Sequence, residues 1–300
     1  MVLTSDVGPC GAVLRWHMGE LRWHAPTTRA ELEPLLSQDG IRLHGGGTGL
    51  LRNRPASGTL VDLSLVGFSE ISIASDTITI GSTATFASAS RAIAAVQPGH
   101  IVALALSHAA TPALRNRITI GGSVALFPPW SSIVGPLLAT DGRVKLVGHD
   151  AGEVELSEYL ATRDFRQGTA IEAVTCSCEA DAFAYWFEFR RTRLTYPLFT
   201  VSVLTRLAGT EITGCRIVLT GTRGRYARPV HLEEEIVGSA ADSVTIKPSQ
   251  LETIIPDRQG FSSEYLTHVA SVEVTRGIRK AADDMARPEE AGTSGSGGAP

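Results

Sequence analysis

The sequence predicts an α+β fold, and three observations lead to this prediction. Residues 21–63 contain candidate strands on either side of a candidate helix, which is the pattern of a β-α-β unit. Residues 71–80 alternate apolar and polar side chains, as half-buried strands do. Later segments, above all 86–96 and 262–282, have the composition and spacing of helices. With 300 residues, of which 43% are hydrophobic, the chain is long enough to bury a substantial core.

Residues 1–19 form an extension that has no clear pattern. The part of the chain that follows this extension predicts one strand–helix–strand unit. Its segments are, in order, Leu21–His24, Thr28–Gln38, Ile41–Leu43 and Gly58–Leu63. Pro26 ends the first strand. Thr27 or Thr28 is suited to cap the helix, and Glu31 is near enough to complete the cap.

A glycine-rich loop forms the tip of this unit. It consists of three consecutive glycines, Gly45–Gly47, followed by the hydroxyl group of Thr48. Glycine lets the backbone turn tightly and approach a ligand closely, and successive N–H groups can then converge on an anion. The loop is therefore either a cradle for a phosphate group or a turn that only reverses the chain. Short glycine motifs are common, so the loop alone does not decide between these interpretations.

The next section predicts strands, helices and a second glycine-containing segment. The expected elements are Ile71–Ile73, Thr77–Gly81, Phe86–Val96, Ile101–Ala110 and a strand within Leu114–Ala125. Gly121 and Gly122 interrupt this last strand, which indicates a bulge or the close approach of another group. If that group is a ligand, its phosphate would meet the bare N–H groups of the two glycines.

The remainder of the chain predicts further strands and helices. A hairpin is expected at Leu137–Leu146, turning at Asp141-Gly142. Strands are expected at Ala170–Cys176, Ala182–Arg190 and Gly214–Leu219, and Phe199–Leu207 fits either a strand or a helix. Helices are expected at Val230–Ile236, Thr245–Ile255 and Ser262–Ala282. Residues 286–300 are rich in glycine, serine and proline and should form a disordered tail.

Composition excludes several classes of function. The net charge is only -4 and the basic residues are mostly scattered, so we expect no nucleic-acid partner. No apolar run has the length of a membrane span and no signal peptide is recognisable, so we expect a cytoplasmic protein without a membrane partner. The four cysteines do not have the spacing of a zinc or iron–sulfur site. We expect them to be reduced and structural, and we predict no metal site and no catalytic acid–base set within this chain.

Two glycine signatures, weak singly, become specific when they occur together in this order. The first is Gly45-Gly46-Gly47-Thr48, and the second is Arg115-Asn116-x-x-Thr119-Ile120-Gly121-Gly122-Ser123, followed by Ala125 and Pro129. Further matching segments are Leu60–Ser64, Ile78–Thr83 and Arg258–His268. Over about residues 21–282 the chain resembles the FAD-binding (medium) subunit of the molybdenum hydroxylases, the family of xanthine dehydrogenase and aerobic carbon monoxide dehydrogenase.

This resemblance implies a two-subdomain FAD-binding fold of the PCMH/vanillyl-alcohol-oxidase type, followed by a C-terminal α+β domain. The implied limits are residues 1–64 and 65–184 for the subdomains and 185–285 for the C-terminal domain. FAD is the implied cofactor, with its pyrophosphate at both glycine loops and Tyr196 near the flavin ring. The implied FAD-binding residues are Leu43, His44, Gly45, Gly46, Gly47, Thr48, Gly49, Thr119, Ile120, Gly121, Gly122, Ser123 and Tyr196.

The resemblance also implies two partner chains and a path for electrons. A large subunit would carry a molybdenum cofactor and a small subunit would carry [2Fe–2S] clusters, from which FAD would pass electrons to an external acceptor. The chain departs from the family pattern at two positions: Gly49 and Ser132 stand where relatives often have aspartate. They leave two alternatives open: a free-standing FAD-dependent oxidase or dehydrogenase of the same fold, and a flavin-free scaffold.

Overall fold

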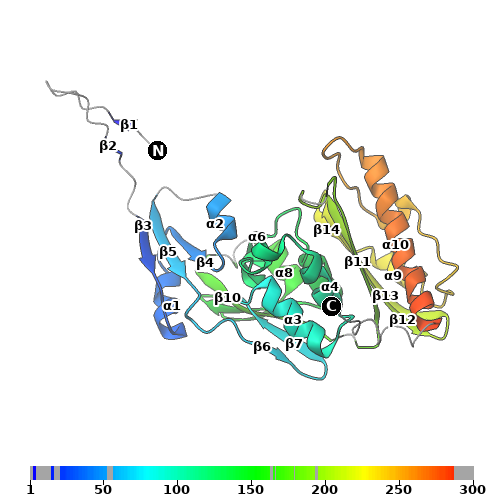
Figure 1. Ribbon diagram of the computed structural model, residues 1–300, viewed down its shortest axis with the longest axis horizontal. Helices are drawn as coiled ribbons and strands as arrows, with labels where there is room; N and C mark the ends of the chain where they lie inside the picture. Colours follow the sequence, from blue (N-terminus) through cyan, green and yellow to red (C-terminus); the bar gives the residue numbers. More distant parts are fainter. Residues whose placement is uncertain are drawn as a thin grey trace, which may run out of the picture.

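The computed structural model describes residues 21–52, 57–162, 165, 167–178, 180–192 and 195–286, together with two short strands nearer the N-terminus. These are β1 (Leu3–Thr4) and β2 (Arg15–Trp16), which pair in antiparallel fashion. The rest of the predicted extension and residues 287–300 of the predicted tail lie outside the described residues. Three larger sheets and their helices make up the described chain, so the predicted α+β class is confirmed (Figure 1).

The first unit is a small parallel sheet in the order β3 (Leu21–His24), β5 (Gly58–Asp62) and β4 (Ile41–His44). Helix α1 (Arg29–Leu36) connects β3 to β4, as a parallel arrangement requires. Thr28 caps α1, since its hydroxyl accepts a hydrogen bond from the backbone N–H of Glu31 at 3.2 Å. The predicted strand–helix–strand unit is therefore confirmed. The short helix α2 (Thr48–Arg52) begins directly after the glycines.

The second unit is an antiparallel sheet of five strands. Its order is β6 (Ile71–Ile73), β7 (Thr77–Gly81), β10 (Thr169–Ser177), β8 (Arg143–Gly148) and β9 (Gly152–Glu155). The helices of this unit are α3 (Phe86–Val96), α4 (Ile101–His108), α5 (Pro112–Arg115), α6 (Ile120–Leu126), α7 (Val134–Ala139) and α8 (Leu156–Ala161). Figure 1 shows α3, α4 and α6 gathered on one side of this sheet, between it and the C-terminal part of the chain.

Two predictions in this unit are wrong. The strand expected within Leu114–Ala125 is absent, and α5 and α6 take its place. Thr119 caps α6, and its pairing with Thr85 is a single isolated bridge, so the alternating Ile118-Thr119-Ile120 pattern marks a helix start. The hairpin expected at Leu137–Leu146 does not form. Its second arm belongs to strand β8, but its first arm belongs to the buried helix α7.

The C-terminal part is an antiparallel sheet of four strands backed by a long helix. The strands are β11 (Phe183–Phe189), β12 (Phe199–Ala208), β13 (Glu211–Thr222) and β14 (Arg225–Ala227), in that order. Helix α10 (Ser263–Ala286) covers the outer face of this sheet, and α9 (Val230–Glu235) lies nearby (Figure 1). The helix predicted at Thr245–Ile255 is wrong: only the short 3-10 helix η2 (Pro248–Leu251) forms there.

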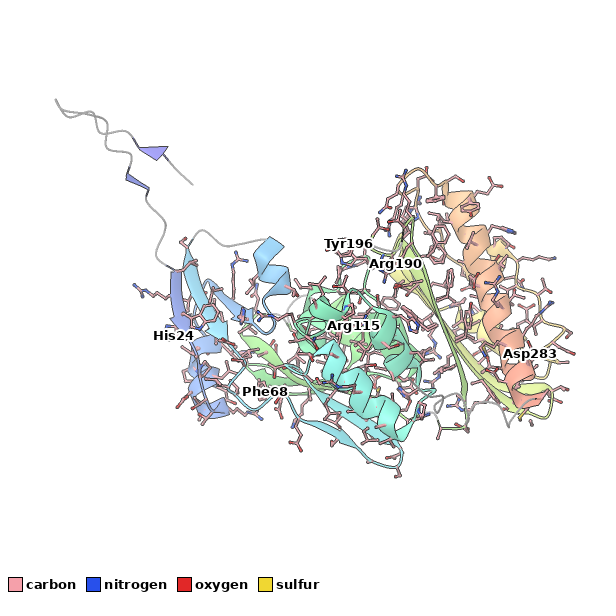
Figure 2. The ribbon with its side chains drawn as sticks, viewed as in Figure 1. His24, Phe68, Arg115, Arg190, Tyr196 and Asp283 are labelled. Atoms are coloured by element: carbon pink, nitrogen blue, oxygen red, sulfur yellow. The ribbon has the colours of Figure 1, made fainter. Side chains whose placement is uncertain are left out.

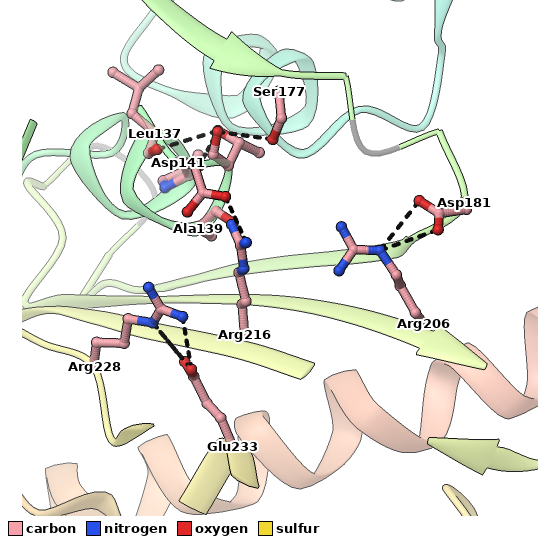
Figure 3. A network of polar contacts seen from close by, with 11 residues as sticks. Leu137, Ala139, Asp141, Ser177, Asp181, Arg206, Arg216, Arg228 and Glu233 are labelled. Atoms are coloured by element: carbon pink, nitrogen blue, oxygen red, sulfur yellow. Dashed lines mark hydrogen bonds and ion pairs between the residues drawn. The ribbon is translucent and has the colours of Figure 1, made fainter. Parts of the chain in front are cut away.

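The C-terminal sheet packs on the second unit through its other face. Leu204 of β12 and Val218 of β13 join the apolar cluster that contains Leu137 of α7. Arg216 of β13 strengthens this junction, because it donates a hydrogen bond of 3.0 Å to the carbonyl oxygen of Ala139 and pairs with Asp141 (Figure 3). Residues 199–205 of β12 are buried on both faces for this reason.

Candidate functional site

The two glycine segments, far apart in the sequence, lie against each other in space. A Cβ atom on Gly46 would stand 1.6 Å from the carbonyl oxygen of Arg117, so main chain meets main chain and only glycine fits. The guanidinium group of Arg117 also donates a hydrogen bond of 3.3 Å to the carbonyl oxygen of Gly46. A Cβ atom on Gly45 would stand 2.9 Å from the hydroxyl oxygen of Thr119. The structure thus brings together the two segments that the sequence singled out.

The first loop keeps its N–H groups available. The backbone N–H groups of Gly45, Gly46 and Gly47 donate no hydrogen bond to any described residue, and all three glycines are partly exposed. Gly47 has φ +75°, a left-handed conformation that favours glycine, and this reverses the chain into α2. Unpaired N–H groups at an accessible turn are suited to bind an anion.

The second segment differs from its expectation. The N–H group of Gly121 is not bare, because it donates to the carbonyl oxygen of Ser82 at 2.8 Å. The N–H group of Gly122 donates weakly, at 3.3 Å, to the hydroxyl oxygen of Thr119, and that of Ser123 donates to the carbonyl oxygen of Thr119. The bulge and the bare-backbone site are therefore both replaced by the first turn of α6. The polar side chains at this turn are those of Thr119 and Ser123.

His44 lies directly beneath the first loop. A Cβ atom on Gly47 would stand 2.7 Å from Nε2 of His44. On the other side of the ring, Nδ1 lies 3.3 Å from Oδ1 of Asp62, an ion-pair distance without the geometry of a hydrogen bond. Trp23 packs on the same ring, with ring centroids 5.0 Å apart. The imidazole is thus held with Nε2 toward the glycine loop.

Asp62, which no local sequence pattern singles out, lies beside His44 under the first loop. Burial raises the pKa of Asp62, but the hydrogen bonds from Ser64 and the closeness of the His44 ring outweigh burial and bring this pKa below its ordinary value. The carboxylate is therefore charged at neutral pH. Its position at the end of β5, opposite His44 on β4, follows from the parallel register. Only that register, which no local pattern fixes, could have indicated the pair.

The remaining predicted residues near the loops have mainly packing roles. Gly49 faces Leu126, since a Cβ atom on Gly49 would stand 2.3 Å from a methyl carbon of that side chain. This contact gives a physical reason for glycine at this position. Ile120 is fully buried in the core. Leu43 lines a cavity of about 750 Å³ between the end of α1, β4 and the turns around His149 and Gly168.

Tyr196 lies apart from the glycine loops, beside the C-terminal sheet. Its ring is 53% exposed and contacts Trp130, with centroids 4.8 Å apart. Figure 2 shows Tyr196 and Arg190 together near the end of β11. Arg190 donates to the carbonyl oxygen of Thr195 at 3.2 Å and pairs with Glu188. This group of aromatic and charged side chains joins the second unit to the C-terminal sheet.

Glu188, which pairs with Arg190, is a second residue that no local sequence pattern singles out. Burial raises the pKa of its carboxyl group, although Arg190, His108 and Ser132 act in the opposite direction. Ser132, which stands where relatives often have aspartate, is itself buried and belongs to this cluster. An aspartate there would place a second buried carboxylate beside Glu188, at a cost in electrostatic repulsion.

Two absences concern the part of the chain that the structure describes. Within those residues, no three His, Cys, Asp or Glu side chains gather as metal ligands do. Over the same ranges, none of the helices combines the length and apolarity needed to cross a membrane.

Cys176, Cys178 and Cys215 are buried and free of disulfides. Burial raises the pKa of the Cys176 and Cys215 thiols to about 12, so these thiols are not nucleophiles.

Comparison with known proteins identifies the family. A family described as "FAD binding domain in molybdopterin dehydrogenase" matches residues 19–176, which is more than half of the chain. The match includes both glycine segments, and it defines a FAD-dependent oxidoreductase. The chain belongs to this family of molybdopterin dehydrogenase FAD-binding domains, and FAD is its cofactor. Comparison with curated proteins gave no match.

Solved structures extend the similarity to the whole fold. Quinoline 2-oxidoreductase from Pseudomonas putida 86 matches with a TM-score of 0.77 and 21% identity, over 89% of this chain and 99% of that chain. Reconstituted CO dehydrogenase from Oligotropha carboxidovorans matches with a TM-score of 0.77 and 20% identity, over 88% of this chain and 98% of that one. CO dehydrogenase from Hydrogenophaga pseudoflava matches with a TM-score of 0.77 and 21% identity, over 89% and 98%. At this identity the likeness establishes the fold, including the C-terminal part beyond residue 176.

Proposed function

We propose that this chain is the FAD-binding subunit of a molybdenum-containing hydroxylase or dehydrogenase. The observation that carries the proposal is the contact between the two glycine segments. It occurs in a fold that matches one chain of CO dehydrogenase over 98% of that chain. When bound, FAD would supply the redox chemistry, accepting electrons from [2Fe–2S] clusters of a partner and passing them to an external acceptor. This chain would bind and orient the cofactor.

The residues present fit the phosphates of FAD. The N–H groups of Gly45–Gly47 lie at a turn whose close contacts with neighbouring residues leave no room for a Cβ atom, and they have no partner among the described residues. The hydroxyl groups of Thr48, Thr119 and Ser123 and the guanidinium group of Arg117 are the further donors suited to the pyrophosphate. Tyr196 is proposed to lie near the flavin ring, where its ring contact with Trp130 would provide an aromatic wall.

The division into domains and the partners belong to the same proposal. The first two units, residues 1–64 and 65–184, would hold FAD between them, and residues 185–285 would form the C-terminal domain. The partners would be a large subunit with the molybdenum cofactor and a small subunit with the iron–sulfur clusters. A cytoplasmic location is part of this proposal as well.

One alternative has a specific observation in its favour. Gly49 and Ser132 replace carboxylates common in relatives, and both are tightly packed, against Leu126 and in the Glu188 cluster respectively. A free-standing FAD-dependent oxidase or dehydrogenase of the same fold would have lost such contacts without losing FAD.

Purification under native conditions tests the proposal. The chain is tagged at its natural level in its source cells and isolated gently, and the isolated material is analysed for flavin, iron and molybdenum. We expect a flavin spectrum, with iron and molybdenum in constant ratio to flavin and two further chains. A flavin-loaded chain that elutes alone, without either metal, and that oxidises a substrate by itself would favour the alternative. A colourless chain would overturn both readings.

A further inference from the structure

Among the side chains that the structure describes, the charges beside the first glycine loop come from identifiable elements. Neither glycine segment contains lysine. Arg117, from the link between α5 and α6, contacts the carbonyl oxygen of Gly46. Asp62 on β5 faces His44, and Arg42 lies on the same face of β4 as His44, two residues earlier and exposed. Trp23, the neighbour from β3, carries no charge. Over the described residues, a dianionic pyrophosphate at this loop would therefore have Arg117 as the permanent cation in contact with the loop and His44 as the neighbouring histidine.

The ring of His44 lies between the carboxylate of Asp62 and the glycine loop. The side chains of His44 and Asp62 are only 19% and 16% exposed, so water screens their interaction weakly. If the ring is neutral with its proton on Nδ1, toward Asp62, the lone pair of Nε2 faces the loop and repels a phosphate oxygen. If the ring is protonated, Nδ1 faces the carboxylate and Nε2–H can donate to the phosphate.

We propose that His44, held by Asp62 and Trp23, binds the FAD pyrophosphate as an imidazolium ion, so that FAD binding takes up one proton. The inference rests on the proposed function, since it needs the pyrophosphate at the first loop. His44 is the residue in contact with the cofactor, and Asp62 and Trp23 are positioning residues. Because binding then takes up a proton, the pair makes retention of FAD depend on pH.

The sign of the effect follows from proton linkage. Between the pH at which the ring of the free chain loses its proton and the higher pH at which the ring of the complex would lose it, the complex holds more protons than the free chain, so affinity for FAD falls as pH rises through that interval. Arg117 and Arg42 disfavour the imidazolium ion and Asp62 favours it, and the added phosphate charge acts with Asp62. The diphosphate diester itself does not titrate near neutral pH, so the pH dependence reports on the protein.

The experiment measures the dissociation constant of FAD from the flavin-free full-length chain between pH 6 and pH 8.5, by quenching of flavin fluorescence. We expect the wild-type affinity to fall by about tenfold or more across this range. His44→Gln should bind FAD as weakly at pH 6 as the wild type does at pH 8.5, with little change between. His44→Lys, which keeps its charge throughout, should restore affinity at high pH. Asp62→Asn should reduce the pH dependence.

Two control variants separate the proposal from general effects. Arg117→Gln should weaken FAD binding by a similar factor at every pH, because guanidinium does not titrate in this range. His24→Gln removes an exposed histidine of β3, on the strand face opposite Trp23, which packs on His44, and should leave the profile unchanged. Calorimetry in two buffers of different ionisation enthalpy should detect proton uptake in the wild type and none in His44→Gln.

Each result decides for or against the inference. A wild-type profile that is flat, or a His44→Gln profile that keeps the wild-type slope, overturns the role of His44 and leaves the proposed function intact. A wild-type chain that binds no FAD at any pH overturns the proposed function, and this inference with it.

Discussion

At the scale of single residues, glycine is used where two backbones must touch. Gly46 meets the carbonyl group of Arg117 and Gly121 meets Ser82, where a Cβ atom would stand 2.5 Å from the Cβ of that serine. Gly122 differs from both, since an added Cβ atom would approach only the hydroxyl oxygen of Thr119, at 2.8 Å. Gly122 is therefore the position where a small side chain can be introduced with the least disturbance, and it can serve as a probe of charge.

Paired substitutions at Gly122 test the position of the pyrophosphate. Gly122→Asp and Gly122→Asn introduce side chains of nearly equal size, and only the first adds a negative charge. We expect Gly122→Asp to lose about five- to thirtyfold more affinity for FAD than Gly122→Asn, because charge repulsion at a partly buried site amounts to about 1–2 kcal/mol. Fluorescence titration of the flavin-free chains measures both. Equal affinities for the two variants would mean that the pyrophosphate is not near α6.

At the scale of elements, the long helix α10 packs closely on its sheet at a glycine residue. Gly277 lies against the ring of Tyr185 on β11, and a Cβ atom there would stand 2.7 Å from Cδ1. The hydroxyl group of Tyr185 donates to Glu273, one turn earlier on the helix, at 2.5 Å. Burial and the Glu273 carboxylate both raise the pKa of Tyr185, so it remains a hydrogen-bond donor.

Filling this contact should destabilise the chain. Gly277→Leu inserts four carbons between helix and sheet, and we expect the free energy of unfolding to fall by about 1–3 kcal/mol, as for other overpacked cores. Urea denaturation followed by circular dichroism measures the change. Val272→Ala, at a side chain that is 40% exposed on the same helix, should change the free energy by less than about 0.5 kcal/mol. Similar values for the two variants would contradict the close packing at Gly277.

At the scale of the whole molecule, a buried histidine connects the helices to the second sheet. His100 is 2% exposed, and its Nδ1 accepts a hydrogen bond from the N–H of Val102, at the start of α4. Its Nε2 lies 3.0 Å from the carbonyl oxygen of Ser177, at the end of β10. These two partners require neutral imidazole with its proton on Nε2. Burial lowers the pKa of His100, although the Ser177 carbonyl acts in the opposite direction.

This histidine should make stability depend on pH. Because the folded-state pKa is below the ordinary value of 6.5, the unfolded chain takes up the proton first as pH falls. The stabilisation is complete above that value and is lost below it, by at most about 1.4 kcal/mol per pH unit. Melting temperatures between pH 7.5 and pH 5 should fall less in His100→Asn, which can still cap the helix, than in the wild type. His149→Asn, at an exposed histidine, should follow the wild type; equal slopes for His100→Asn would refute the prediction.

Local sequence patterns were sufficient for much of the fold. The capped helix α1, the alternating strands β6 and β7 and the long helix α10 lie close to their expected positions, because each is encoded by neighbouring residues. The expectations that failed, at α6, α7 and η2, concern short segments whose conformation depends on distant partners. The N–H of Gly121, for example, is satisfied by Ser82, and no local pattern reports such a contact.

The sequence by itself determined the class of fold, the two glycine segments and the family they define, since these depend on residue type and order. Only the tertiary structure decided that the two segments meet at Gly46 and Arg117 and that Asp62 stands opposite His44. The reason is physical: residue type sets what the local backbone can do, whereas the register of parallel strands and the packing of helices set which distant groups share a site.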